Sequence, residues 1–133
     1  MKKLIIFLIL ILFLILNSVN AIEPNQTKDS DEPGPYNVGY YKVYYKNPNY
    51  GTYLATIRYP AKYDGLLAPI DDSNSPYPGI VVSNGWAGSE WNIKWIPKHL
   101  SSYGYITICF TPPNQFIGNT TQWAIGFKDG IEK

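Results

Sequence analysis

The sequence predicts an α/β fold: an N-terminal antiparallel hairpin, followed by a β-α-β-α arrangement of a mainly parallel sheet. Three observations predict it. Polar and apolar residues alternate between residues 40 and 60, two short apolar runs rich in β-branched residues follow after residue 79, and apolar residues recur at helical spacing between and after those runs. Strands that alternate along the chain with helices are typical of a sheet covered by helices.

The hairpin is predicted from two alternating stretches, residues 40–46 and 51–60, on either side of a turn. One face of the pair would carry the apolar side chains of Tyr41, Val43, Tyr45, Tyr53, Ala55, Ile57 and Tyr59. The intervening Asn47-Pro48-Asn49-Tyr50 consists mainly of residue types that favour turns. We therefore expect antiparallel strands with one buried face and one face in water.

The later strands lack this alternation. Residues 80–82 and 105–110 form short apolar runs, as expected for strands covered on both faces. Between them, Pro97 requires a helix that starts close to Ile93 or kinks, and Gly104 is a natural C-cap. The apolar residues expected to face the sheet are Ile93, Ile96, Leu100 and Tyr103 in this helix, and Trp123, Ile125, Phe127 and Ile131 in a second helix over residues 120–133.

The N-terminal residues predict export. Lys2 and Lys3 precede thirteen apolar residues, and Val19-Asn20-Ala21 supplies a signal-peptidase site. A helix of that length spans about 20 Å, against roughly 30 Å of hydrocarbon core, which favours a cleaved signal over an anchor. We expect a signal peptide at residues 1–21, a flexible linker at 22–35, a folded domain at 36–133, a secreted location and no stable membrane insertion after cleavage.

Charge and cysteine content exclude several classes of function. Nine basic and ten acidic residues follow the leader lysines, so the chain offers no basic footprint for nucleic acid. One histidine and one cysteine do not make a metal-ligand set, and we expect neither a metal nor another cofactor. Cys109 lies inside an apolar run and is interpreted as a small buried hydrophobe.

Several motifs occur in register along the folded part. They are Gly34-Pro35-Tyr36-Asn37-Val38, Thr56-Ile57-Arg58-Tyr59-Pro60, Pro78-Gly79-Ile80-Val81-Val82, Gly85-Trp86, Ile93-Lys94-Trp95 and Leu100-Ser101-Ser102-Tyr103-Gly104-Tyr105. In order and spacing they resemble the start of bacterial cutinases and polyester (PET) hydrolases, and the wider dienelactone-hydrolase-like group fits too. The resemblance covers residues 34–133. It implies the N-terminal part of an α/β-hydrolase that cleaves a small-molecule or polymeric carboxylic ester without a cofactor.

The resemblance assigns one catalytic feature to this chain. Gly85 and Trp86 match family positions that bind substrate, and the Trp86 backbone N–H matches a donor of the oxyanion hole after the third strand. The family commonly has Tyr or Phe in place of this Trp. Alternatively, the Trp86 indole only packs beneath a loop. Trp91 and Trp95 are interpreted as packing residues.

The catalytic triad is expected beyond Lys133. No G-x-S-x-G motif occurs, because Ser89 follows Gly88 but lacks the second glycine. The resembling fold carries its Ser, Asp or Glu, and His in that order after the next strand. His99 is the only histidine, lies earlier than that and is expected to be non-catalytic. The chain is therefore expected to be truncated before the nucleophile elbow.

Three hypotheses of function follow. The first is a secreted serine hydrolase of carboxylic esters, represented by its N-terminal part. The second is a secreted binding or adhesion module, since twelve Tyr and four Trp can stack on sugars or polymer, although buried parallel strands argue against it. The third is an inactive truncated gene product. The gene sequence downstream of Lys133 distinguishes the three.

Overall fold

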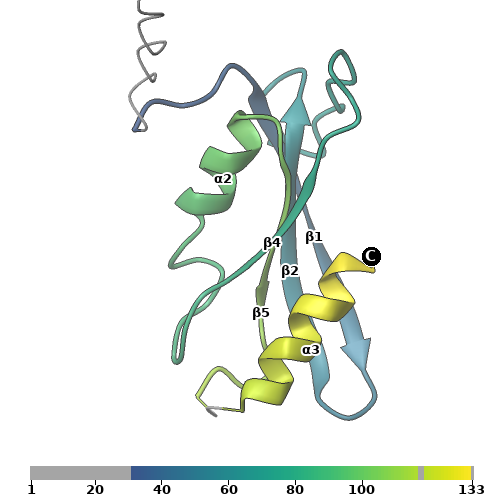
Figure 1. The fold of residues 1–133 in the computed structure, drawn as a ribbon, viewed down its shortest axis with the longest axis vertical. Helices are drawn as coiled ribbons and strands as arrows, with labels where there is room; N and C mark the ends of the chain where they lie inside the picture. Colours follow the sequence, from purple (N-terminus) through teal and green to yellow (C-terminus); the bar gives the residue numbers. More distant parts are fainter. Residues whose placement is uncertain (1–30, 117–118, 133) are drawn as a thin grey trace, which may run out of the picture. The chain divides into compact units, whose positions relative to one another are not determined.

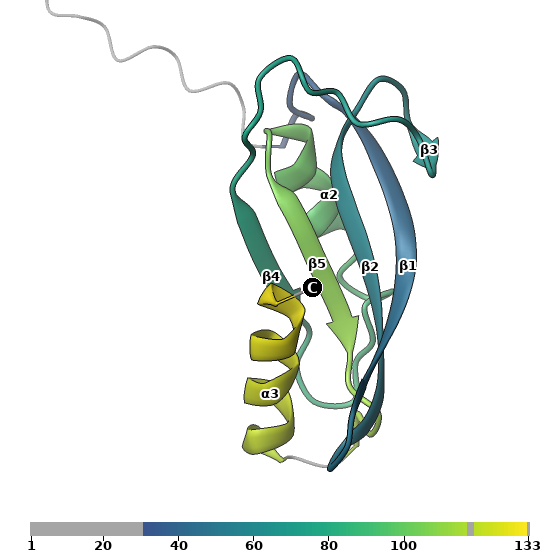
Figure 2. The ribbon, with the colours of Figure 1, turned by 90° about the vertical axis from the view of Figure 1, so that its right-hand side faces the viewer.

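The computed structural model describes residues 31–116 and 119–132. The described residues form one mixed sheet of five strands in the order β3-β1-β2-β5-β4, with two helices, and Figure 2 shows the strands side by side in this order. The expected signal peptide, residues 1–21, and most of the expected linker, residues 22–35, lie outside the described residues. The compact unit begins at Pro33.

Figure 1 shows the helices and strands coloured along the sequence, from β1 to α3 at the C-terminal end. Their bounds are β1 Asn37–Asn47, β2 Gly51–Ala61, β3 Gly65–Leu66, β4 Gly79–Ser83, α2 Trp95–Ser102, β5 Ile106–Thr111 and α3 Thr120–Ile131.

The predicted hairpin is confirmed. Strands β1 and β2 pair antiparallel over their whole length, and the turn between them is closed by Asn49 N–H, which donates to Asn47 Oδ1 at 3.0 Å. The expected apolar face is buried on β2 and half-buried to buried on β1. The opposite face meets water on β1 but not throughout β2, where Thr56 is only 2% exposed because α2 and the loop before it cover this strand.

The β-α-β unit is also present, since β4 and β5 are parallel neighbours joined through α2. The expectation of a mainly parallel sheet is wrong, however. Strand β2 runs antiparallel to both β1 and β5, and the remaining parallel pair, β1 with β3, is only two residues long. The hairpin determines only the direction of β2 relative to β1, whereas the antiparallel pairing of β2 with β5 joins segments that are far apart in the chain.

The two helices pack on opposite faces of the sheet. Ser101 of α2 meets Thr107 with their hydroxyl oxygens 3.0 Å apart, whereas the helix α3 lies against Val81, Ile108 and Phe110, whose side chains point to the other face. The predicted apolar stripes do not supply the closest contacts. Buried instead are Pro97, Ser101 and Ser102 in α2, and Gln122, Gly126 and Gly130 in α3.

The residues predicted to face the sheet are therefore more exposed than expected. Ile93, Ile96 and Leu100 are half-buried and Tyr103 is exposed, and in α3 Ile131 is 74% exposed. The reason is the close approach of both helices to the strands, which leaves room for small side chains at the contact and moves the large ones to its sides.

Candidate functional site

The loop between β4 and α2 leaves the sheet at the carboxyl end of β4. Because β5 is parallel to β4, the loop after β5 leaves at the same edge. Ligands of open α/β sheets bind outside the carboxyl ends of the strands. Two hydrogen bonds join the loops, from Ala87 N–H to the Gln115 carbonyl and from Trp86 Nε1–H to the Phe116 carbonyl, both at 2.8 Å.

Gly85 and Trp86 lie in the turn at the tip of this loop. The Trp86 side chain is 69% exposed, so its indole lies beside the loop after β5 rather than beneath a loop. No acceptor among the described residues takes the Trp86 backbone N–H. A Cβ at Gly85 would meet nothing within 4 Å, so this position is open to a ligand.

Two neighbours shape the turn. Ala87 has φ of +60°, in the left-handed region that costs a non-glycine residue about 1–2 kcal/mol. A side chain at Gly88 would collide with the amide of Asn84. Asn84 is only 8% exposed, and neither its Nδ2 nor its Oδ1 has a hydrogen-bond partner in the described part of the chain. Sequence analysis missed Asn84, although a polar residue directly after an apolar strand is the signal that marks it.

The described residues offer no activated nucleophile. Ser89 Oγ bonds to Asn92 Oδ1 at 3.0 Å, and no described hydroxyl or thiol bonds to the His99 imidazole, which lies in α2 with its ring 5.0 Å from that of Tyr103. Cys109 is buried, and its burial raises the pKa of the thiol to about 12, so it is protonated at neutral pH. Cys109 is thus the buried hydrophobe that its sequence context predicts.

Trp91 and Trp95 are not packing residues, which corrects the expectation for both. Each is 67% exposed. They border a pocket of about 620 Å³ that is lined by β1, β2, the segment after β2, the loop before α2 and α2 itself, a site that sequence analysis did not predict. The signal for it was the i, i+3, i+4, i+7 spacing of Trp91, Lys94, Trp95 and Lys98, although in the structure α2 begins only at Trp95 and the first two residues lie in the turn before it.

A buried polar pair lies at the bottom of this pocket. Glu90 is 7% exposed, and the Thr56 hydroxyl donates to its carboxylate at 2.8 Å. The Glu90 N–H in turn donates to Thr111 Oγ1 at 2.8 Å, which attaches the loop to β5. The neighbouring Arg58 has a buried Nη1 without a hydrogen-bond partner in the described residues. Burial lowers the pKa of Arg58.

Comparison with known proteins gives no family: no protein-family model matches the chain, and no curated protein matches it. Within residues 31–116 and 119–132 no three His, Cys, Asp or Glu side chains are grouped so that they could hold a metal ion. In the same residues no helix is long and apolar enough to cross a membrane.

Proposed function

We propose that this chain is the N-terminal part of a secreted serine hydrolase of carboxylic esters, with the Ser, Asp and His of the triad beyond Lys133. The arrangement of the strands supports the proposal. The resembling fold has a hairpin followed by a β-α-β unit, with the strand before the oxyanion loop open to one further strand. Here β4 has β5 on one side and no partner on its other side within the described residues.

The observation that carries the proposal is the Trp86 N–H, which has no acceptor among the described residues and lies after β4. When a serine attacks an ester carbonyl, the carbonyl oxygen becomes an oxyanion that needs donors already in position. The Trp86 N–H would be one such donor and a residue beyond Lys133 the second. The bonds from Trp86 and Ala87 to the loop after β5 hold the donor in place before substrate binds.

The rest of the reaction needs no cofactor. The serine Oγ forms a bond to the carbonyl carbon, the histidine takes the serine proton, and the alcohol leaves with a proton from that histidine. Water then hydrolyses the acyl-enzyme by the same path. The exposed Trp86 ring would lie beside the acyl group.

The first test is the reading frame downstream of Lys133. It should continue with a strand and a serine nucleophile elbow within roughly 25 residues, as the family resemblance implies. An open reading frame that continues without such a serine would exclude the hydrolase.

The second test uses two substitutions at Trp86 in the complete protein. Trp86→Ala keeps the backbone N–H but loses both the acyl packing and the indole bond to the Phe116 carbonyl, which should together cost about 1–3 kcal/mol in kcat/KM. Trp86→Pro removes the N–H and should lower kcat about a hundredfold or more. Turnover of a p-nitrophenyl ester measures both. Equal, small losses would show that Trp86 is not an oxyanion donor.

A binding module is the second candidate, favoured by the exposure of Trp86, Trp91 and Trp95, each at least 67% exposed. The predominance of antiparallel pairing also removes one objection to it. The binding module would be favoured over the hydrolase if the complete protein, once immobilised on a column, retained a soluble polymer and its sequence contained no nucleophile elbow.

A further inference from the structure

The pocket beside α2 has a floor of side chains from two neighbouring strands. Val38, Tyr40 and Lys42 of β1 and Thr56 and Arg58 of β2 line it. Tyr40 lies directly opposite Arg58 and Lys42 directly opposite Thr56 in the strand register. Side chains opposite one another on antiparallel strands have their Cβ atoms about 5 Å apart, so both members of each pair can contact the same small ligand.

The wall of the pocket is one face of the turn and helix that follow the β4 loop. Trp91, Lys94, Trp95 and Lys98 supply it. The Lys94 ammonium lies 3.5 Å from the centre of the Trp91 ring, which holds both side chains in a cation-π contact. Trp95 and Lys98 are neighbours on the helix face and have no such partner within the described residues, so an indole and an ammonium remain available side by side.

The pocket concentrates positive charge. Four of the nine basic residues that follow the leader lysines line it, against two carboxylates. The carboxylates accept hydrogen bonds from neutral donors: Asp64 Oδ1 accepts from Val38 N–H at 2.6 Å, and Glu90 accepts from the Thr56 hydroxyl. Glu90 also interacts electrostatically with Arg58, and the lining as a whole has two more basic than acidic side chains. Lys42 and Lys98 form no ion pair in the described part of the chain.

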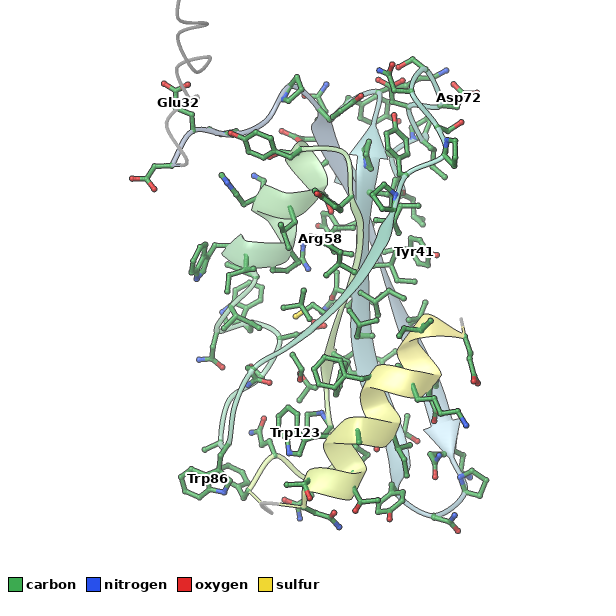
Figure 3. All side chains as sticks on the ribbon, viewed as in Figure 1. Glu32, Tyr41, Arg58, Asp72, Trp86 and Trp123 are labelled. Carbon is green, nitrogen blue, oxygen red and sulfur yellow. The ribbon has the colours of Figure 1, made fainter. Side chains whose placement is uncertain are left out.

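Arg58 supplies the second sign of a ligand. Its buried Nη1 lacks a hydrogen-bond partner among the described residues, and Figure 3 shows the side chain between α2 and the sheet. A buried donor without an acceptor costs free energy, so native proteins rarely leave one unpaired. The guanidinium presents a planar fork of donors that matches a carboxylate.

From these features we propose that the pocket binds an aromatic carboxylate: its carboxylate would bond to Arg58 and lie near Lys98, and its ring would stack on Trp95. A volume of about 620 Å³ is in the range of small-molecule sites. The exposed indoles distinguish this ligand from an inorganic anion, which would use the cations but gain nothing from the rings. Neither Gly85 nor Trp86 lines this pocket, so the inference does not depend on the hydrolase proposal.

The test titrates the full chain with 2-naphthoate by calorimetry and follows the indole N–H signals by NMR. We expect saturable binding with a dissociation constant below roughly 1 mM, with the Trp95 signal shifted most. The neutral 2-naphthalenemethanol should bind at least about tenfold more weakly because it lacks the charge, and acetate because it lacks the ring. Added salt should weaken binding of 2-naphthoate.

Variants locate the site. Arg58→Gln should weaken binding at least about tenfold, since it removes the charged fork. Lys98→Gln and Trp95→Leu change exposed side chains and should not disturb the fold, so they test the site even if Arg58→Gln does not fold. Each should weaken 2-naphthoate binding severalfold. Lys128→Gln and Phe116→Leu are the matched controls outside the pocket and should bind like the unchanged chain.

Three results would overturn the proposal. One is the absence of saturable 2-naphthoate binding up to about 10 mM, which is tenfold above the expected limit of the dissociation constant. Another is an affinity for 2-naphthalenemethanol equal to that for 2-naphthoate. The third is affinity that Lys98→Gln and Trp95→Leu leave unchanged.

Discussion

Tyrosine side chains make up much of the core around α3. The rings of Tyr45 and Tyr53 are stacked 5.0 Å apart on opposite strands, and Phe110 lies edge-on to Tyr53. Buried phenols need partners for their hydroxyls. Here Tyr45 donates to the Gly126 carbonyl at 3.1 Å and Tyr53 to the Gln122 carbonyl at 2.8 Å, so the two rings attach the helix to the hairpin.

The contact explains the glycines of α3 and predicts opposite effects of two similar substitutions. A Cβ at Gly126 would lie 2.5 Å from Phe110 Cε2 and 3.0 Å from Tyr53 Cε1, so Gly126→Ala should overpack the core and cost roughly 1–3 kcal/mol. At Gly130 the nearest atom, Val81 Cγ1, would be 3.4 Å away, an ordinary contact. Gly130→Ala should therefore stabilise the chain by up to about 1 kcal/mol through helix propensity.

Urea unfolding of the two variants provides the measurement. The midpoints should move in opposite directions from that of the unchanged chain. Destabilisation of similar size by both substitutions would mean that α3 does not approach Phe110 as closely as this packing requires.

At the scale of elements, the sequence predicts what local pattern determines and misses what distant partners determine. The hairpin is predicted because alternation and turn residues are local. The sides of α2 and α3 that face the sheet are not, since Ser101 is buried by its hydroxyl contact with Thr107 and Gly126 by the aromatic rings of the strands. The direction in which β2 meets β5 likewise depends on strands far apart in the chain.

Strand β4 provides a prediction at this scale. It lies at the edge of the sheet in the described residues and carries Ile80, Val81 and Val82, an apolar β-branched run. Edge strands of this kind pair with other chains through their free backbone groups. The chain from Ile22 onward should therefore self-associate with rising concentration.

A charge on that edge should reduce the association. Ile80→Lys places a lysine on β4, and Ile131→Lys, its matched control, places one on an α3 position that is already 74% exposed. Sedimentation velocity over a range of concentrations should show more monomer for Ile80→Lys alone. A monomeric unchanged chain, or equal effects of the two lysines, would contradict association through β4.

At the scale of the whole molecule, residues from separate segments converge at both candidate sites. The pocket joins β1, β2 and α2 with the turn before it, and sequence analysis did not predict it: the spacing of its wall residues was the one local signal, and no local pattern indicates that Arg58 lies beside them. The Trp86 loop was found from the sequence through its glycines and the family resemblance. Its bonds to Gln115 and Phe116 cross a gap of about thirty residues in the chain, and no local pattern predicts them.

The buried acids of the core predict how stability depends on pH. Burial raises the pKa of the Tyr53 phenol to about 12, with a smaller contribution from Asp129, and burial likewise raises the pKa of Tyr45. Burial also raises the pKa of Cys109 from 9.0 to about 12. In each case the folded state retains a proton that the unfolded state releases.

The contribution of these three groups to stability should therefore be constant up to about pH 8 and fall as the pH rises from there towards 12, because the unfolded chain binds fewer protons throughout that range. Cys109 is the only one of the three whose unfolded pKa lies near 9, so Cys109→Ala should move the onset of the loss towards pH 10, where the tyrosines begin to ionise. The free energy of unfolding, measured by urea titration at half-unit steps from pH 8 to 11, gives both onsets. The two proteins are compared by how the free energy of unfolding changes with pH rather than by its absolute value, because the substitution also removes a buried sulfur. Identical onsets in the two proteins would show that the Cys109 thiol is not held protonated by the fold.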